Sequence, residues 1–301
     1  MERLAERRQL SETGKWRWFP TLLLNLTFYP LMILWIVAGV LAAPLCLVVW
    51  KLLTGWDLGR IMRQLIRIHG RGLMLIVSPF VRCSGHGLDA IERPCILVVN
   101  HLSFFDSYFM AALPFHDVIF AVGAWPFKMY WYTLFMRLAR YLDVEQGDWQ
   151  KVIRTSTQSF ALQGGVLFFP EGHRSRTGGL QPFHSGAFRL SQATGVPIVP
   201  LCIGGTDRLL PPGHFLLHPA RVQLKALPPL YPAAFPGTSG HVAMRQEARK
   251  LMARTLKEMQ GGGASAPTSG CSRTPWLPSA TCRCELAGLG ALCADSTKGE
   301  R

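Results

Sequence analysis

The chain has 301 residues, which is enough for one compact core or for one core with a membrane anchor. Hydrophobic residues make up 49% of it, and the formal net charge at pH 7 is +14. A basic chain suits nucleic acid, an anionic membrane surface or anionic substrates. Because a nucleic-acid-binding protein has no need of so much apolar sequence, the composition argues against nucleic acid as a partner and favours a membrane surface.

The first predicted element is a long apolar segment. Residues 20–50 contain no charged side chain, and about 20 helical residues suffice to cross the hydrocarbon core of a bilayer. Pro30 and Pro44 interrupt the segment, so both a kinked transmembrane helix and a shallow re-entrant helical pair fit it. The segment is too long for the apolar part of a signal peptide and for an ordinary buried helix. We therefore expect a membrane-anchoring helical region.

A basic segment follows the anchor. Residues 51–82 contain one acidic residue, Asp57, and the basic residues Lys51, Arg60, Arg63, Arg67, Arg71 and Arg82. Ile61, Leu65, Ile68 and Leu75 recur at helical spacing. The pattern predicts a helix at the bilayer interface, with an ordinary solvated basic face as the alternative. We assign residues 1–82 to the anchor and its interfacial segment, and the positive-inside rule places the rest of the chain on the cytoplasmic side.

From residue 83 the chain alternates between strand-like and helix-like segments. Strands are predicted at residues 95–99, 118–122, 166–169, 198–203 and 222–227. Asp148 is placed to cap one helix, and Met244, Ala248, Leu251 and Met252 mark the apolar side of another. This rhythm predicts an α/β domain over residues 83–260, with a layered mixed sheet flanked by helices. Residues 261–301 have no periodicity and many turn-forming residues, so we expect a disordered tail.

The eight cysteines do not predict a disulfide framework or a metal site. Cys95 and Cys202 lie in strand-like runs, where a free cysteine behaves as a small hydrophobic residue. Cys282 and Cys284 form a C-x-C pair without a second pair at zinc-ligand spacing. We expect no metal, and a reducing compartment is the simpler assumption.

The first group of candidate catalytic residues is an H-x4-D pattern directly after the predicted strand 95–99. On one regular helix His101 and Asp106 would lie about 140° apart and could not meet. If His101 instead lies in the loop and Asp106 in the first helical turn, the carboxylate can fold back to the imidazole. That pairing would fix the tautomer and leave the other ring nitrogen free as a general base. A structural histidine at a strand end is the alternative.

The second group is the sequence F-P-E-G-H-R-S at residues 169–175, after another predicted strand. Gly172 allows backbone N–H groups to approach an oxyanion closely, and Arg174 offers a planar fork for a phosphate. Glu171 can hold either Arg174 or a substrate hydroxyl. A polar turn with an incidental ion pair is the alternative.

Together with V-P-I-V-P at residues 196–200, these two motifs resemble those of the glycerolipid acyltransferases, whose best-known members are the 1-acylglycerol-3-phosphate acyltransferases. The resemblance covers residues 80–230. It implies that His101, oriented by Asp106, takes the proton of an acceptor hydroxyl, which then attacks the thioester of acyl-CoA or acyl-carrier protein. It further implies that Glu171, Gly172, Arg174 and Ser175 bind a lyso-phospholipid acceptor, without a cofactor.

Departures from the family pattern leave the acceptor open. His173 and His184 stand where the family often has Thr and Lys, and residues 142–145 do not reproduce its second motif. Another lyso-lipid or a lipid-linked acceptor therefore stays an alternative to 1-acylglycerol-3-phosphate. Lys128 and Arg137 are expected either at the site entrance or against lipid headgroups. A non-catalytic lipid-binding protein is the alternative of another class, and a metal hydrolase lacks a third ligand near His101.

Overall fold

The structure is a computed structural model, which describes residues 2–115, 117–123, 130–145, 147–175, 179–211 and 213–261. Its strands are β1 (Val81–His86), β2 (Cys95–Val99), β3 (Val118–Val122), β4 (Leu142–Asp143), β5 (Gly165–Phe168), β6 (Ile198–Gly204) and β7 (Ala220–Ala226). They form one seven-stranded sheet in the order β1-β7-β6-β2-β5-β3-β4. Every neighbouring pair is parallel except β6 and β7, which are antiparallel. The mixed sheet expected from the sequence is confirmed.

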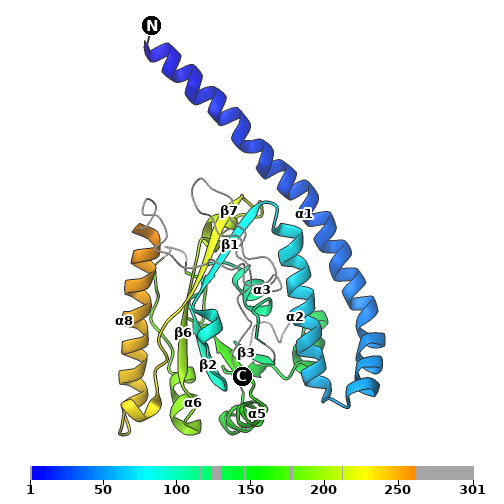
Figure 1. Cartoon of the computed structure of the whole chain (residues 1–301), viewed down its shortest axis with the longest axis vertical. Helices are drawn as coiled ribbons and strands as arrows, with labels where there is room; N and C mark the ends of the chain where they lie inside the picture. The colour runs from blue at the N-terminus through cyan, green and yellow to red at the C-terminus, as the bar shows by residue number, and fades with distance from the viewer. Residues whose placement is uncertain are drawn as a thin grey trace, which may run out of the picture.

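Helices cover both faces of this sheet (Figure 1). They are α1 (Glu2–Thr54), α2 (Leu58–Val77), α3 (Asp106–Ala111), α4 (Tyr130–Leu138), α5 (Trp149–Ala161), α6 (Gly186–Thr194), α7 (Thr206–Leu209) and α8 (Gly240–Gly261), with short 3-10 turns at Leu88–Ala90 and Pro232–Ala234. Side chains alternate along the fully buried strand β2: Leu97 packs with residues of α1, α2 and α3, and Ile96 packs with residues of α5, α6 and α8. The sheet thus separates two apolar cores.

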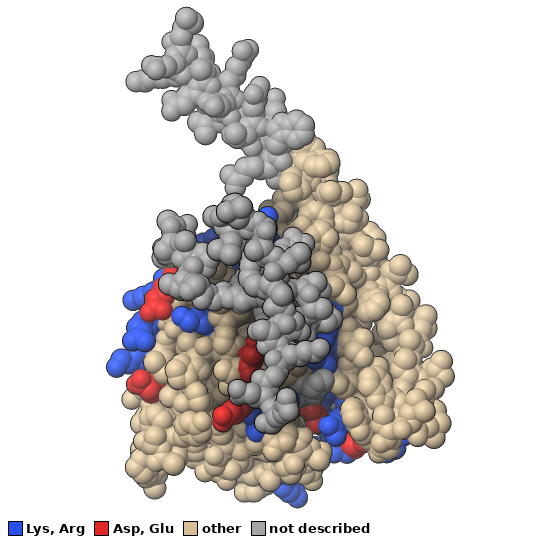
Figure 2. Space-filling view, viewed as in Figure 1, with Lys and Arg blue, Asp and Glu red and all other residues tan. Residues whose placement is uncertain are grey.

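The predicted anchor is a single continuous helix, α1, with Pro20, Pro30 and Pro44 inside it. Within its part from Trp18 to Thr54, the most apolar stretch of 18 residues has a mean hydropathy of 2.7, and α1 is the one helix in the described parts of the chain that is long and apolar enough to cross a membrane. Figure 2 shows the outer side of α1 largely free of acidic and basic side chains, which gather on other parts of the molecule. The opposite side of α1 packs on α2, where Trp35 donates a hydrogen bond of 3.0 Å to the His69 carbonyl.

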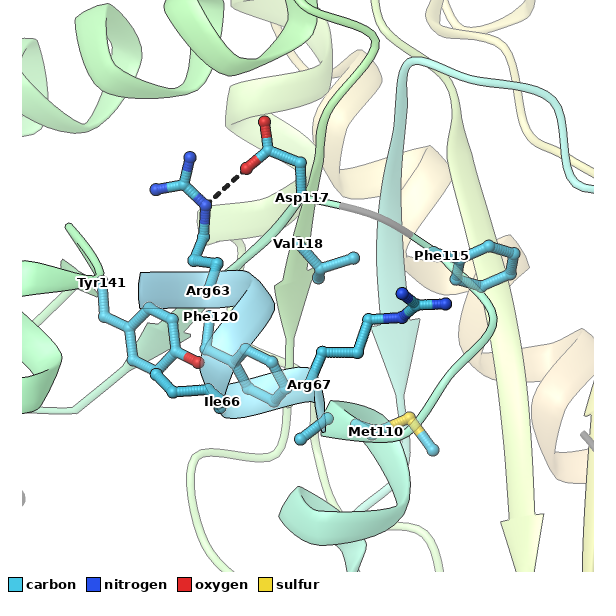
Figure 3. Close-up of a pocket in the computed structure, with 10 residues that line it drawn as sticks. Arg63, Ile66, Arg67, Met110, Phe115, Asp117, Val118, Phe120 and Tyr141 are labelled. Atoms are coloured by element: carbon cyan, nitrogen blue, oxygen red, sulfur yellow. Dashed lines mark hydrogen bonds and ion pairs between the residues drawn. The ribbon is translucent and has the colours of Figure 1, made fainter. Parts of the chain in front are cut away.

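The basic residues of α2 do not form a free surface. Arg63 is buried, and its Nε donates to Asp117 Oδ1 at 2.5 Å (Figure 3). Arg67 and Arg71 donate to the carbonyls of Leu113 and Ala112, just after α3. These three guanidinium groups satisfy carbonyl and carboxylate groups of the α/β domain, and the interfacial position predicted for the segment stays a prediction.

The predicted domain boundaries stay a prediction. Strand β1 begins at Val81, before the proposed boundary at residue 83, and α2 packs on α3 through the hydrogen bonds of its arginines. Helix α2 is therefore attached directly to the domain by hydrogen bonds, rather than joined to it only by a linker. The predicted disordered tail falls outside the described residues after Gly261.

Candidate active site

The position of His101 is set by the residue before it. Asn100 follows β2 directly, is fully buried, and exchanges two hydrogen bonds with the backbone of Ile203 in β6. Its Oδ1 accepts the Ile203 N–H at 2.8 Å, and its Nδ2 donates to the Ile203 carbonyl at 2.9 Å. The side-chain amide thus continues the pairing of the two strands beyond the end of β2. His101 consequently leaves the sheet at a fixed point on its rim.

His101 and Asp106 lie in hydrogen-bond contact, with 2.8 Å between Nδ1 and Oδ2. The same carboxylate oxygen accepts the backbone N–H groups of Leu102 and Ser103 at 2.6 and 2.8 Å. We refer to residues 101–106 as the His–Asp turn. Asp106 begins α3 and is fully buried, while the His101 side chain is 16% exposed. The carboxylate therefore folds back to the imidazole, in the arrangement that the sequence made possible.

This contact decides which imidazole nitrogen is available. A carboxylate only accepts hydrogen bonds. The hydrogen of a neutral His101 imidazole is therefore on Nδ1, which donates a hydrogen bond to the Asp106 carboxylate. The lone pair then lies on Nε2, the nitrogen that can accept a proton from a bound hydroxyl. The phenyl ring of Phe169 stacks on the imidazole, with 4.3 Å between the ring centroids, and fixes the plane of the ring.

The second motif reaches His101 because β5 is the neighbour of β2 in the sheet. Val98 is paired with Phe168, so His101 and Glu171 each lie three residues beyond a paired position. The Glu171 Oε1 accepts the His101 backbone N–H at 2.8 Å, and the Ser175 N–H donates to the His101 carbonyl at 2.8 Å. Two motifs about 70 residues apart therefore meet through hydrogen bonds to the N–H and carbonyl groups of His101.

Glu171 is 3% exposed, and both of its carboxylate oxygens are used inside the protein. Oε2 accepts the backbone N–H of Gln181 at 2.8 Å, so one side chain joins the His–Asp turn to the segment before α6. Burial raises the pKa of Glu171; the N–H donors of Gln181 and His101 oppose this rise, and the nearby charge of Asp106 adds to it. The carboxylate holds these backbone groups rather than Arg174, and its assignment as an acceptor-binding group stays a prediction.

The three other residues predicted to bind the acceptor have different surroundings. Gly172 has a φ of +71° and its N–H donates to the Phe169 carbonyl, so the glycine forms the turn itself. Ser175 is buried, and its hydroxyl donates to the Gly179 carbonyl at 2.6 Å. The Arg174 side chain is exposed and its guanidinium has no partner among the residues that the structure describes. Arg174 is accordingly the cation in this motif that is free to meet an anionic ligand.

The remaining predicted positions lie around this site or away from it. His173 and His184 are exposed, and the His184 ring lies over Gly172, where a Cβ atom would approach its Nε2 to 3.1 Å. Arg137 is exposed on α4, and Lys128 falls outside the described residues. Among the residues described, there is no group of three His, Cys, Asp or Glu side chains placed to hold a metal ion.

A small cavity lies elsewhere, between α2, α3 and β3 (Figure 3). Arg63, Arg67, Asp117 and Tyr141 are among its lining residues. Asp117 directly precedes β3, whereas His101 follows the carboxyl end of β2, and both strands run parallel to β5. Asp117 and the cavity beside it therefore lie towards the amino ends of these strands, whereas His101 lies at their carboxyl ends. Burial and the neighbouring charges of Arg71 and Arg93 lower the pKa of Arg67 to about 10.

The comparisons with known proteins all find similarity to acyltransferases. Residues 82–204 match the family model described as Acyltransferase. The 1-acyl-sn-glycerol-3-phosphate acyltransferase BAT2, chloroplastic, of Brassica napus is 30% identical over 46% of this chain and 41% of its own. The 1-acyl-sn-glycerol-3-phosphate acyltransferase of Escherichia coli (strain K12) is 32% identical over 35% of this chain and 42% of its own. That of Limnanthes douglasii is 27% identical over 60% and 65%, so the matches span less than two thirds of each relative.

A solved structure shares the fold. The crystal structure of the 1-acyl-sn-glycerophosphate (LPA) acyltransferase PlsC from Thermotoga maritima has a TM-score of 0.65 against this chain. The similarity covers 83% of this chain and 100% of that one, with 21% sequence identity. The His–Asp turn and the motif at residues 169–175 both fall inside the segment matched by the family model.

Proposed function

We propose that this protein is a glycerolipid O-acyltransferase, a proposal supported by the match of residues 82–204 to the family model described as Acyltransferase. It moves a fatty acyl group from acyl-CoA or acyl-carrier protein to the hydroxyl of a lyso-glycerophospholipid. The proposed acceptor is 1-acylglycerol-3-phosphate, the acceptor in the printed names of its relatives, and the product is phosphatidic acid. The observation that carries the proposal is the contact of 2.8 Å between His101 and Asp106, which leaves His101 Nε2 free at the rim of the sheet.

The proposed reaction is a direct transfer. His101 Nε2 takes the proton of the acceptor hydroxyl as its oxygen attacks the thioester carbonyl carbon. The tetrahedral intermediate then collapses, the carbon–sulfur bond breaks, and the imidazolium returns the proton to the leaving thiolate. The Asp106 carboxylate stabilises the imidazolium between these steps. The nearest hydroxyl, that of Ser103, is buried and donates to the Leu210 carbonyl at 3.2 Å, which argues against an acyl-serine intermediate.

The acceptor phosphate is assigned to Arg174. Its exposed guanidinium lies three residues after Glu171, on the turn that is hydrogen-bonded to His101 through the Ser175 N–H. A planar guanidinium can bind two phosphate oxygens at once. Such binding would bring the glycerol part of the acceptor towards the His–Asp turn.

We place the enzyme at a membrane, with α1 as its anchor and the catalytic domain on the cytoplasmic side. Leu24 and Phe28 on one side of α1 are buried against the domain, whereas Leu26 and Leu34 on the other side are exposed. Only one side of the helix is therefore available to hydrocarbon along this part. This favours a shallow, re-entrant arrangement of α1 and α2 over a helix that crosses the bilayer alone.

The test is an acyl-transfer assay with membranes that contain the full chain. Labelled acyl-CoA and acyl-carrier protein are each offered with a panel of lyso-lipid acceptors, beside the His101→Ala variant. Labelled phosphatidic acid that disappears in the variant is the expected result. Transfer only to other acceptors would mean that another lyso-lipid, and not 1-acylglycerol-3-phosphate, is the acceptor. His173 and His184, which depart from the family pattern, would then be the residues to examine. Absence of transfer from either donor would favour a lipid-binding protein.

A further inference from the structure

We propose that the loop between α7 and β7 is a second membrane-contact element, which inserts Phe215 and Leu216 into the hydrocarbon of the lipid layer that holds α1. The partner is thus a lipid monolayer, contacted next to the His–Asp turn. The inference rests on the proposed membrane location of the enzyme. It concerns a part of the chain outside the segment matched by the family model, which ends at residue 204.

The first observation is the exposure of two neighbouring large apolar side chains. Phe215 is 87% exposed and Leu216 is 57% exposed, although both are of a size that folding normally buries. The next residue, Leu217, is fully buried in the core that contains α1 and α3 side chains. The loop thus inserts one leucine into the protein and directs an adjacent apolar pair outwards.

The second observation is that α1 holds the loop firmly. The Asn25 side chain exchanges two hydrogen bonds of 2.8 Å with the N–H and carbonyl of Leu217, and the Tyr29 hydroxyl donates to the Phe215 carbonyl. At the base of the loop, the His218 N–H donates to the Leu209 carbonyl at 2.8 Å. An exposed apolar pair on a fixed backbone pays little entropy when it enters a membrane, because the loop is already ordered.

Asn25 explains why the loop and the anchor belong together. It is an amide within the uncharged residues 20–50, and a polar side chain among apolar ones is costly unless it is hydrogen-bonded. The Leu217 backbone satisfies it on both the donor and the acceptor side. On the same helix Leu22 and Leu26 are exposed, so the apolar surface of α1 continues from the helix onto the loop. A layer that receives the outer side of α1 would meet Phe215 as well.

The third observation is the short path from the loop to the proposed site. The carbonyl of Leu210, at the start of the loop, accepts a hydrogen bond from the hydroxyl of Ser103 in the His–Asp turn. Phe28 of α1 lies against Phe105 of the same turn, with 5.7 Å between the ring centroids. A membrane contact at Phe215 would therefore place the site beside the headgroups, where an acceptor can bind while its acyl chain stays in the hydrocarbon.

Photocrosslinking in vesicles tests the contact directly. The full chain is reconstituted in vesicles of phosphatidylcholine and phosphatidylglycerol, with p-benzoylphenylalanine in place of Phe215, of Phe19 on α1, or of the exposed aromatic Tyr231, which lies near the start of β6, whereas the loop enters β7 near the end of β6. We expect lipid adducts at positions 215 and 19 and none at 231. Adducts at 19 without adducts at 215, or a crosslink from 215 to a second copy of the chain, would overturn the proposal and leave the membrane location intact. No adduct at 19 would remove the membrane location itself.

A functional comparison uses two leucines with the same exposure. Leu216 and Leu162, which follows α5, are each 57% exposed, and only Leu216 belongs to the loop. For Leu216→Ser we expect acyl transfer to a long-chain acceptor in vesicles to fall about tenfold, because a buried leucine contributes that much to partitioning. Transfer to a short-chain, water-soluble acceptor should stay unchanged, as should both activities of Leu162→Ser. Equal losses on both acceptors would mean that Leu216 supports the fold of the site rather than a membrane contact.

Discussion

The backbone N–H of His101 donates to the carboxylate of Glu171 over 2.8 Å, so the two motifs of the site are one hydrogen-bonded unit. The imidazole of His101 points its Nδ1 to Asp106, and Glu171 holds the backbone from which that imidazole extends. Glu171 is therefore placed to influence the reaction through the position of His101, even without contact with a substrate. The predictions below separate the two roles.

Replacement of His101 by Ala should abolish acyl transfer while the protein stays folded and membrane-bound. General-base catalysis contributes roughly 10²- to 10⁴-fold to a rate, and His101 is the base that the contact with Asp106 orients. The measurement is the initial rate of labelled product formation, with circular dichroism as the control for folding. A variant that keeps most of its turnover would exclude His101 as the base.

Glu171→Gln should lower kcat more than it raises the KM of either substrate. The amide has one acceptor oxygen, so one of the N–H groups of His101 and Gln181 would lose its partner at a cost of about 1–3 kcal/mol. The His–Asp turn would shift as a result, and the chemical step is more sensitive to such a shift than binding is. Steady-state kinetics with each substrate varied in turn measures the split. A selective increase in the acceptor KM would instead support direct contact of Glu171 with the acceptor.

The stability of the protein should decrease as the pH rises above the ordinary Glu171 pKa of 4.5, and Glu171→Gln should remove that decrease. Burial raises the pKa of Glu171 in the folded state, so the folded protein binds this proton more tightly than the unfolded chain does. The stabilisation is complete below the unfolded pKa and is lost as the pH passes through the folded value. Thermal unfolding of both forms across this range is the measurement; identical pH profiles would contradict the prediction.

Arg174→Ala should raise the acceptor KM and leave the KM of the acyl donor nearly unchanged. The guanidinium is exposed and has no partner among the described residues, so its loss should leave the fold intact. A charge-assisted hydrogen bond to phosphate contributes about 1.5–3 kcal/mol, which corresponds to a change in kcat/KM of roughly 10- to 100-fold. The matched control is Arg189→Ala, because Arg189 is also exposed but lies on α6 and outside the motif. Equal effects on donor and acceptor would assign Arg174 a structural role.

Asp117→Asn should destabilise the protein by about 3 kcal/mol or more. Asp117 is buried with Arg63 at 2.5 Å and Arg60 at 3.9 Å, and the loss of its charge would leave Arg63 buried without a counterion. Glu258→Gln, in an exposed ion pair with Lys225, should change stability by less than about 1 kcal/mol. Chemical unfolding in detergent compares the two variants. A similar small effect of both would mean that water reaches the Arg63–Asp117 pair.

Much of the sheet follows from local pattern. The strands predicted at residues 95–99 and 118–122 have the bounds of β2 and β3, because both are runs of apolar residues that are buried on two faces. Strand β1 escaped the prediction, since Val81–His86 is a half-exposed edge strand with polar and glycine positions. The two-residue strand β4 is too short to leave a periodic signal.

The sequence singles out the residues of the candidate site but not the contacts between them. The H-x4-D spacing made the pairing of His101 with Asp106 possible, and the start of α3 at Asp106 explains it. The roles of Asn100 and Glu171 depend on which strands are neighbours in the sheet, and nothing in the local sequence contains that order. Arg63 of α2 shows the same limit, because its partner Asp117 lies 54 residues away in sequence.

The pairing of Val98 with Phe168 has a consequence for how the chain can vary in length. His101 and Glu171 sit at equal distances past that pair, so a residue inserted into or deleted from either connection would move one partner along the strand direction by about 3.3 Å and out of hydrogen-bond range. The short segments between each strand and its polar residue are thus fixed in length as a matched pair, and loops that tolerate insertion must begin further along the chain.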